Sequence, residues 1–176
     1  MAYLTKEEML EKGLKTGEGV LISDKASIYG AGNIQIGDNV RIDDFCLLSA
    51  VGGNIKIGSH IHIAAYVSFF GAAGIELGDF TTVSSYTSIY SASDSYKGDV
   101  LIGPTIDEDL TNVSKKKVTL RDYSAVGTHA VILPGVELGE GAVLGASSMA
   151  IKNLSPWTIN SGVPAKELKG RSKELI

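Results

Sequence analysis

A six-residue rhythm runs through most of this chain and restricts its possible folds more than any other feature. Aliphatic residues followed by a small or acidic residue open units such as IGDNVR at Ile36, IGSHIH at Ile57, LGDFTT at Leu77 and LGEGAV at Leu138. The fourth residue after each aliphatic anchor is also small or apolar, so two side chains of every unit point inward across a short strand. Such hexapeptide units predict an all-β fold, a parallel β-helix whose stacked coils bury one continuous core.

The anchors also fall into groups of three, and three strands with three corners make one triangular coil. The anchor positions of successive coils are 36, 42 and 48; 57, 63 and 69; 77, 83 and 89; 120, 126 and 132; and 138, 144 and 150. The early irregularities lie between these groups, as two short insertions, SAVGGN and FGAAG, and one long stretch over 91–117. All insertions therefore leave from one corner, and the long one forms a loop. A β-sandwich would space its turns at about 8–12 residues and would lose this phase.

The chain is long enough for one domain with a real core and too short for two comfortable ones. We expect a cap over 1–19, the β-helix over 20–154 with its loop over 91–117, and a tail over 155–176. Thr5 and Glu8 form a capping box and Gly13 follows, which predicts a short helix over 5–12. The ending PAKELKGRSKELI predicts a broken basic helix that caps the last coil.

Composition excludes several classes of partner. The formal net charge of −4 leaves no overall basic field for a nucleic-acid backbone. No apolar run reaches the roughly 18–20 residues of a membrane span, and the start MAYLTKEEML lacks the pattern of a signal peptide. We therefore expect a cytoplasmic protein with no membrane span. The single Cys46 fits a reducing compartment and a packing role.

The hexapeptide units, the long loop after TSIYSASD and the ending with GVPAK resemble the bacterial hexapeptide acyltransferases. The nearest resemblance is to the galactoside and maltose O-acetyltransferases and to the sugar acetyltransferases of surface-polysaccharide gene clusters. The resemblance implies a left-handed β-helix, a homotrimer, and acetyl-CoA bound between adjacent subunits. Aromatic side chains at turn positions, such as Phe45 and Tyr66, add a physical reason to bury these corners against a neighbour.

Asp94 stands where the resemblance places the catalytic base. Acyl transfer from a thioester needs a base, a donor for the developing oxyanion and a positioned acceptor. In the galactoside and maltose enzymes the base is a His after the last strand before the loop, and the aligned residue here is Asp94. It can act as a base, contact the acceptor by a charge-assisted bond, or cap the SDSY turn. A second departure is Phe45, beside Asp43 and Asp44, where those enzymes place an Asn that contacts the acceptor.

Histidine supplies the alternative base. His62 precedes the inward anchor Ile63, so its side chain points outward, and it is the first candidate for the general base. His60 and His129 occupy equivalent turn slots, third after their anchors. Because metal ligands must converge on one ion at about 2 Å, these three histidines do not predict a metal site.

The cofactor residues come from the resemblance and from small corners. Thr128, Ala146 and Lys152 match positions that touch CoA in the galactoside enzyme, and Lys166 is placed for the adenosine phosphates. Gly127 and Ser147 belong to the small corners that leave room for the pantetheine arm.

The acceptor is expected to be a sugar. Asp43 and Tyr96 are the candidate contacts, because a tyrosine ring stacks on sugars and acidic groups favour an amino sugar. The main interpretation is an acetyl-CoA-dependent acetyltransferase of a sugar or nucleotide-linked sugar in surface-polysaccharide biosynthesis, which needs no metal.

The atom that is acetylated stays open. O-transfer is slightly preferred with His62 as base, and N-transfer to a nucleotide-linked amino sugar is the alternative with Asp94. A different class, an inactive trimeric scaffold or binding protein, also stays open.

Overall fold

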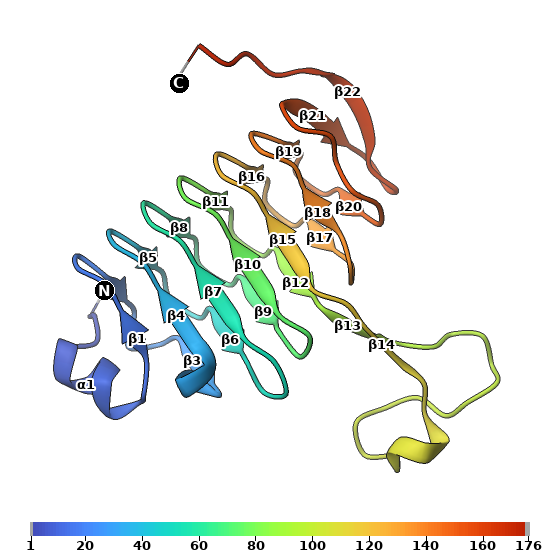
Figure 1. Ribbon diagram of the computed structural model, residues 1–176, viewed down its shortest axis with the longest axis horizontal. Helices are drawn as coiled ribbons and strands as arrows, with labels where there is room; N and C mark the ends of the chain where they lie inside the picture. The colour runs from blue at the N-terminus through green and yellow to red at the C-terminus, as the bar shows by residue number, and fades with distance from the viewer. Residues whose placement is uncertain (1, 175–176) are drawn as a thin grey trace.

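The computed structural model describes residues 2–174, and its chain winds into a parallel β-helix with three faces. Figure 1 shows the coils stacked along one axis, with α1 (Lys6–Glu11) at one end of the stack and β21 (Thr158–Ser161) and β22 (Lys166–Gly170) at the other. The hexapeptide prediction is confirmed, since every neighbouring pair of strands on the three faces is parallel except the last pair at the C-terminal end.

Each face consists of one strand from each coil. The first face contains β1 (Lys15–Thr16), β4 (Ile34–Ile36), β7 (Ile55–Ile57), β10 (Ile75–Leu77), β15 (Val118–Leu120) and β18 (Glu137–Leu138). The second face contains β2 (Leu21–Ile22), β5 (Arg41–Ile42), β8 (His62–Ile63), β11 (Thr82–Val83), β16 (Ala125–Val126), β19 (Val143–Leu144), β21 (Thr158–Ser161) and β22 (Lys166–Gly170). The third face contains β3 (Ser27–Tyr29), β6 (Leu47–Ser49), β9 (Ser68–Phe70), β12 (Ser88–Tyr90), β17 (Val131–Ile132) and β20 (Met149–Ala150).

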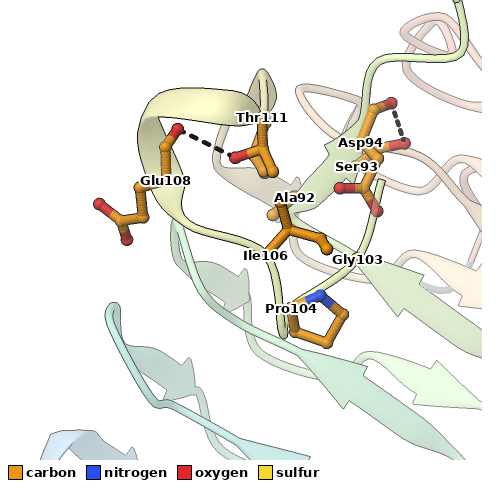
Figure 2. Close-up of a pocket in the computed structure, with 9 residues that line it drawn as sticks. Ala92, Ser93, Asp94, Gly103, Pro104, Ile106, Glu108 and Thr111 are labelled. Carbon is orange, nitrogen blue, oxygen red and sulfur yellow. Dashed lines mark hydrogen bonds between the residues drawn. The ribbon is translucent and has the colours of Figure 1, made fainter. Parts of the chain in front are cut away.

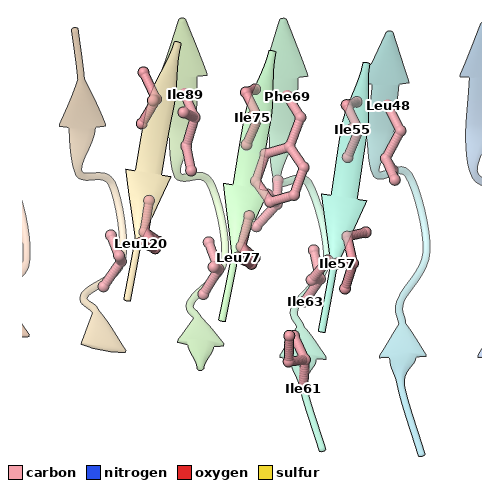
Figure 3. Packing of buried hydrophobic residues seen from close by; sticks show 14 of the residues in the cluster. Leu48, Ile55, Ile57, Ile61, Ile63, Phe69, Ile75, Leu77, Ile89 and Leu120 are labelled. Carbon is pink, nitrogen blue, oxygen red and sulfur yellow. The ribbon is translucent and has the colours of Figure 1, made fainter. Parts of the chain in front are cut away.

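The anchors form continuous columns inside the prism. On the first face Ile57 pairs with Leu77, and Leu77 pairs with Leu120 of the next coil. Figure 3 shows the aliphatic side chains of successive coils lying one above another, with Phe69 as the aromatic member of its column. Phe69 is fully buried. Because the columns are continuous, equivalent corners of successive coils are separated by the distance between neighbouring strands.

The corners differ in how they turn. The first corner joins the first face to the second, and the second corner joins the second face to the third. Residues at these corners have left-handed backbones without being glycine, with φ of 61° at Phe45, 59° at His60 and 57° at His129. The third corner, between the third face and the first, carries the short helix η1 (Ala31–Asn33) and all the insertions, as the phase of the repeat predicted.

The long insertion is a hairpin with an extended tip. It leaves the third corner after β12, and β13 (Ala92–Asp94) pairs antiparallel with β14 (Val113–Lys115) to form its stem. The short helix η2 (Glu108–Leu110) lies in the tip, and the whole segment projects away from the prism (Figure 1).

The N-terminal cap agrees with its prediction. Helix α1 (Lys6–Glu11) has the full capping box, because the Thr5 side chain accepts a hydrogen bond from Glu8 N and Glu8 bonds back to Thr5 N. Gly13, with φ 86°, follows the helix. Met9 is the helix residue buried against the first coil.

The expected C-terminal helix is wrong. Residues 166–170 form β22, which folds back antiparallel on β21 and extends the second face. The last coil leaves unpaired backbone groups on that edge, and a returning strand satisfies them. A helix of this length is marginal in water, and Gly170 would interrupt it.

Candidate functional site

Asp94 lies between two cavities at the root of the hairpin. One cavity, of about 350 Å³, is bounded by the hairpin tip through Gly103, Pro104 and Glu108; Figure 2 shows these residues together with Asp94 as parts of its lining. The other, also of about 350 Å³, lies on the prism side and is lined by Tyr90, Leu133 and Tyr96. Strand β13 contributes Ala92, Ser93 and Asp94 to both cavities. The half-buried Asp94 is therefore accessible from two sides.

The Asp94 carboxylate has no hydrogen-bond donor within residues 2–174. The side chain of the neighbouring Ser93 donates from its Oγ to the backbone carbonyl of Asp94, at 3.3 Å, and not to the carboxylate. Asp94 belongs to a strand, and its side chain caps no turn, so the turn-cap interpretation is wrong. A carboxylate without internal partners beside two cavities is available to a ligand.

A second polar cluster occupies the early coils of the second face. Arg41 and His62 are cross-strand neighbours on β5 and β8, and both side chains reach Asp43. Arg41 Nε donates to Asp43 Oδ1 at 2.7 Å, and His62 Nε2 lies 2.8 Å from Asp43 Oδ2. Burial raises the pKa of Asp43, but the hydrogen bonds from His62 and Arg41 outweigh it and hold the pKa below its ordinary value. His62 points outward, as predicted, with its Nε2 already paired.

The predicted cofactor residues lie at two different corners. The late coils of the second corner carry Gly127, Thr128, Ala146 and Ser147, of which the last three are exposed. Lys152 is exposed at the third corner.

The remaining predicted residues also lie in different parts of the prism. Lys166 is exposed on β22, while Asp43 lies at the second corner beside His62. Asp94 and the exposed Tyr96 belong to the third corner. The width of the third face therefore separates the two groups of predicted residues within one chain.

Most residues that line the two cavities escaped the sequence interpretation, and Tyr90, Leu133 and Glu108 are examples. Tyr90 ends the last strand before the loop, Leu133 follows the neighbouring strand, and Glu108 comes from the hairpin tip. The pairing of Ile89 with Ile132 brings Tyr90 and Leu133 together, and the repeat phase contains that pairing. The position of Glu108 depends on how the hairpin tip folds, which no periodicity encodes.

Over residues 2–174, no group of three or more His, Cys, Asp or Glu side chains could hold a metal ion. Within the same range, no helix has both the length and the apolar character needed to cross a membrane.

Comparisons of the whole chain with known proteins find acyltransferases. No family model matches the chain. A dTDP-4-amino-4,6-dideoxy-D-glucose acyltransferase from Escherichia coli is 43% identical over 177 residues, covering 100% of this chain and 92% of the relative. A variant of AntD, an N-acyltransferase from Bacillus cereus, in complex with dTDP-4-amino-4,6-dideoxyglucose and coenzyme A has a TM-score of 0.94 and 44% identity, covering 98% of this chain and 92% of that one. AntD in complex with dTDP and 3-hydroxybutyryl-CoA has a TM-score of 0.94 and 45% identity over the same shares.

Proposed function

Since this chain belongs to the hexapeptide-repeat acyltransferases, the family of dTDP-4-amino-4,6-dideoxy-D-glucose acyltransferase, we propose that it acylates the amino group of a dTDP-linked amino sugar. The chain is an acyltransferase with the left-handed β-helix fold, and a coenzyme A thioester is its co-substrate. The amino-sugar acceptor of the relatives supports N-transfer, the interpretation that the sequence ranked behind O-transfer. The product is suited to the assembly of a surface polysaccharide.

The chemistry asks little of the protein beyond positioning and one proton acceptor. The amine nitrogen attacks the thioester carbonyl, a C–N bond forms, the C–S bond breaks, and the CoA thiolate leaves with the electron pair. The nitrogen loses one proton in the process. Asp94 accepts this proton and passes it to the departing thiolate, which becomes the CoA thiol. Thiolate is a good leaving group, so no general acid is needed to start C–S cleavage.

The observation that carries this proposal is the free carboxylate of Asp94 between two cavities. A carboxylate binds an ammonium or amine donor by a charge-assisted hydrogen bond. One cavity admits the acceptor sugar, whose ring can stack on Tyr96, and the other admits the thioester. The two reactants then meet at Asp94 from opposite sides.

We further propose that three copies of the chain assemble and that each site lies between two of them. The predicted cofactor corner and Asp94 stand at opposite edges of the third face in one chain. The second corner of one copy placed against the third corner of the next would bring both groups together. Half-exposed aromatic rings along the second corner, such as Tyr66 and Tyr86, support burial of that edge in an assembly.

The test is thiol release from acetyl-CoA with two matched dTDP-sugars that bear an amine or a hydroxyl at the same carbon. N-transfer predicts release with the amine sugar and none above background with the hydroxyl sugar. Release with the hydroxyl sugar alone would contradict N-transfer.

The second candidate is O-transfer, and the Asp43–His62 pair is the observation in its favour. A carboxylate that holds one ring nitrogen of a histidine is the arrangement that orients a general base. O-transfer predicts that His62→Ala abolishes thiol release with the hydroxyl sugar. N-transfer through Asp94 predicts that the same variant keeps its activity with the amine sugar.

A further inference from the structure

The first and second corners each carry a column of stacked aromatic rings. At the second corner Phe45 stacks on Tyr66 at 5.0 Å, Tyr66 on Tyr86 at 4.8 Å, and Tyr86 on His129 at 4.7 Å between ring centroids. These distances equal the separation of neighbouring strands, because each coil presents one ring from the same left-handed position. Each interior ring of the column is therefore stacked on a ring at both faces. Each ring at an end of the column is stacked on a ring at one face only.

The first corner shows how the fold fills such a column. His60 stacks on Phe80 at 4.9 Å and Phe80 on Tyr123 at 5.2 Å, but the next coil has Gly141 at this position. Trp157 of the following coil would stand two strand spacings from Tyr123, about 9–10 Å away, yet its ring lies at 6.1 Å with a 31° tilt. A Cβ added at Gly141 would lie 2.5 Å from the indole. The indole has thus entered the slot that Gly141 leaves empty.

The outer ends of two columns are also covered. The Lys25 ammonium lies 5.5 Å from the centre of the Phe45 ring. Arg171 and Lys173 lie 5.8 Å and 5.4 Å from the Trp157 ring. Cations above aromatic faces are stabilising, so the chain covers these ends with its own side chains.

The upper end of the second-corner column is different. The coil above His129 has Ser147 at the stacking position, with φ 53°, and both residues are exposed. Among residues 2–174, Tyr86 is the one ring that stacks on His129, and no cation lies over it. Ser147 extends only a short way from the backbone, so no ring or cation of the described residues covers the outer face of the imidazole.

The surroundings of this slot suit a nucleotide. The corner segments on either side of it, 127–129 and 145–147, contain no charged residue. His60 is the other histidine that ends a column of rings. It lies at the first corner beside Asp38 and Asp79, whose carboxylates repel phosphate groups. Glycine at 127 and 145 allows the neighbouring coils to stack closely here, because a Cβ would lie 2.4 Å from Ala146 N at the first position and 3.1 Å from Ser161 Oγ at the second.

We infer that the open face of His129, above Tyr86 and beside Ser147, is a stacking site for the base of a nucleotide substrate. The inference rests on the proposed function, which supplies two nucleotides, the adenine-bearing CoA and the thymine-bearing dTDP-sugar. Both bases are planar rings that stack on aromatic side chains, and the described column has Ser147 rather than a ring at the coil above His129. A base bound there extends the column of rings by one more coil, in the way that Trp157 extends the column at the first corner.

The test measures the dissociation constants of CoA and of dTDP, each alone, by calorimetry on the full-length protein. Stacking on one ring predicts that His129→Ala raises the dissociation constant of one of the two nucleotides about 10-fold and leaves the other unchanged. His129→Phe keeps a ring and retains affinity. Ser147→Tyr adds a ring to the column, fills the slot and weakens binding of the same nucleotide. The nucleotide that responds identifies the base as adenine or thymine.

His60→Ala is the matched control, since it removes the same side chain from the equivalent position at the carboxylate-rich corner. It leaves both dissociation constants unchanged. Unchanged affinities in both His129→Ala and Ser147→Tyr would overturn the inference, and so would equal losses for both nucleotides, because one slot cannot hold two bases. If the unmodified protein binds neither nucleotide, the proposed function fails instead.

Discussion

Asp94 and His62 illustrate two ways in which a polar side chain can be placed at the surface of a β-helix. His62 is paired with Asp43, which also accepts a hydrogen bond from Arg41, so this cluster satisfies itself. Asp94 has no hydrogen-bond donor for its carboxylate within the described residues and faces two cavities. A group left unsatisfied by its own chain is the one available for chemistry with a substrate.

Replacing the carboxylate of Asp94 by an amide tests its role in proton transfer. Asp94→Asn keeps the shape of the side chain but accepts no proton, so kcat/KM for the amine sugar falls by about 100-fold or more. The measurement is steady-state thiol release over a range of sugar concentrations. Asp107→Asn, an exposed change in the same hairpin, is the control and keeps normal kinetics. Normal kinetics in Asp94→Asn would remove Asp94 from the mechanism.

The Asp43 cluster predicts a pH dependence of stability. The pKa of Asp43 is lower in the folded chain than its ordinary value, so its ion pair stabilises the fold above the ordinary aspartate pKa of about 4. This contribution is lost as pH falls through the lowered pKa. The melting temperature of the unmodified protein therefore exceeds that of Asp43→Asn at pH 7, and the two converge by about pH 3. A gap that stays constant between these pH values would show that the pair contributes no linked stability.

At the scale of single elements, the repeat determined the strands and failed at the chain's end. Anchors such as Ile57 and Leu77 specify which side of each strand faces inward and set the six-residue period. Both properties can be predicted from the amino-acid sequence alone. The tail has no such pattern, so its basic residues suggested a helix. What decides its structure is the open edge of β21, which β22 covers. The structure of the hairpin tip could not be predicted from the sequence either, since the position of Glu108 depends on tertiary contacts.

Arg171 fastens this returning strand to the prism. Its Nη1 atom donates to the carbonyl oxygen of Gly141 at 2.9 Å and to that of Tyr123 at 2.7 Å. These two residues belong to successive coils. Arg171→Ala leaves both carbonyls without that donor and lowers the free energy of unfolding by about 1.5–3 kcal/mol. Denaturant unfolding measures the change. Lys169→Ala, an exposed change on β22, serves as the reference and stays within about 0.5 kcal/mol of the unmodified protein.

At the scale of the whole molecule, the predicted residues divide between two corners that one chain cannot bring together. Sequence comparison by motif identified both groups, but it could not show that the third face lies between them. That separation is visible only once the coils are stacked. It is the observation behind our proposal that each active site forms between two copies of the chain.

A mixing experiment tests this division directly. Asp94→Asn disables the third corner, and Ala146→Trp obstructs the second corner, so each variant alone is inactive. When equal amounts are unfolded and refolded together, random assembly of sites between copies makes about one quarter of them from two intact corners. Thiol release therefore recovers to about 25% of the unmodified rate. If each site lay within one chain, the mixture would stay inactive.

The hairpin over 91–117 is closed where it meets the prism. Lys116 N donates to the carbonyl of Ser91 at 2.9 Å, and Ser91 N donates to Phe70 O of the coil below. The coil thus completes its backbone pairing whatever the intervening residues do. Residues of the hairpin beyond the stem that carries Asp94 can therefore change in length and sequence without disturbing the backbone pairing of the stacked coils.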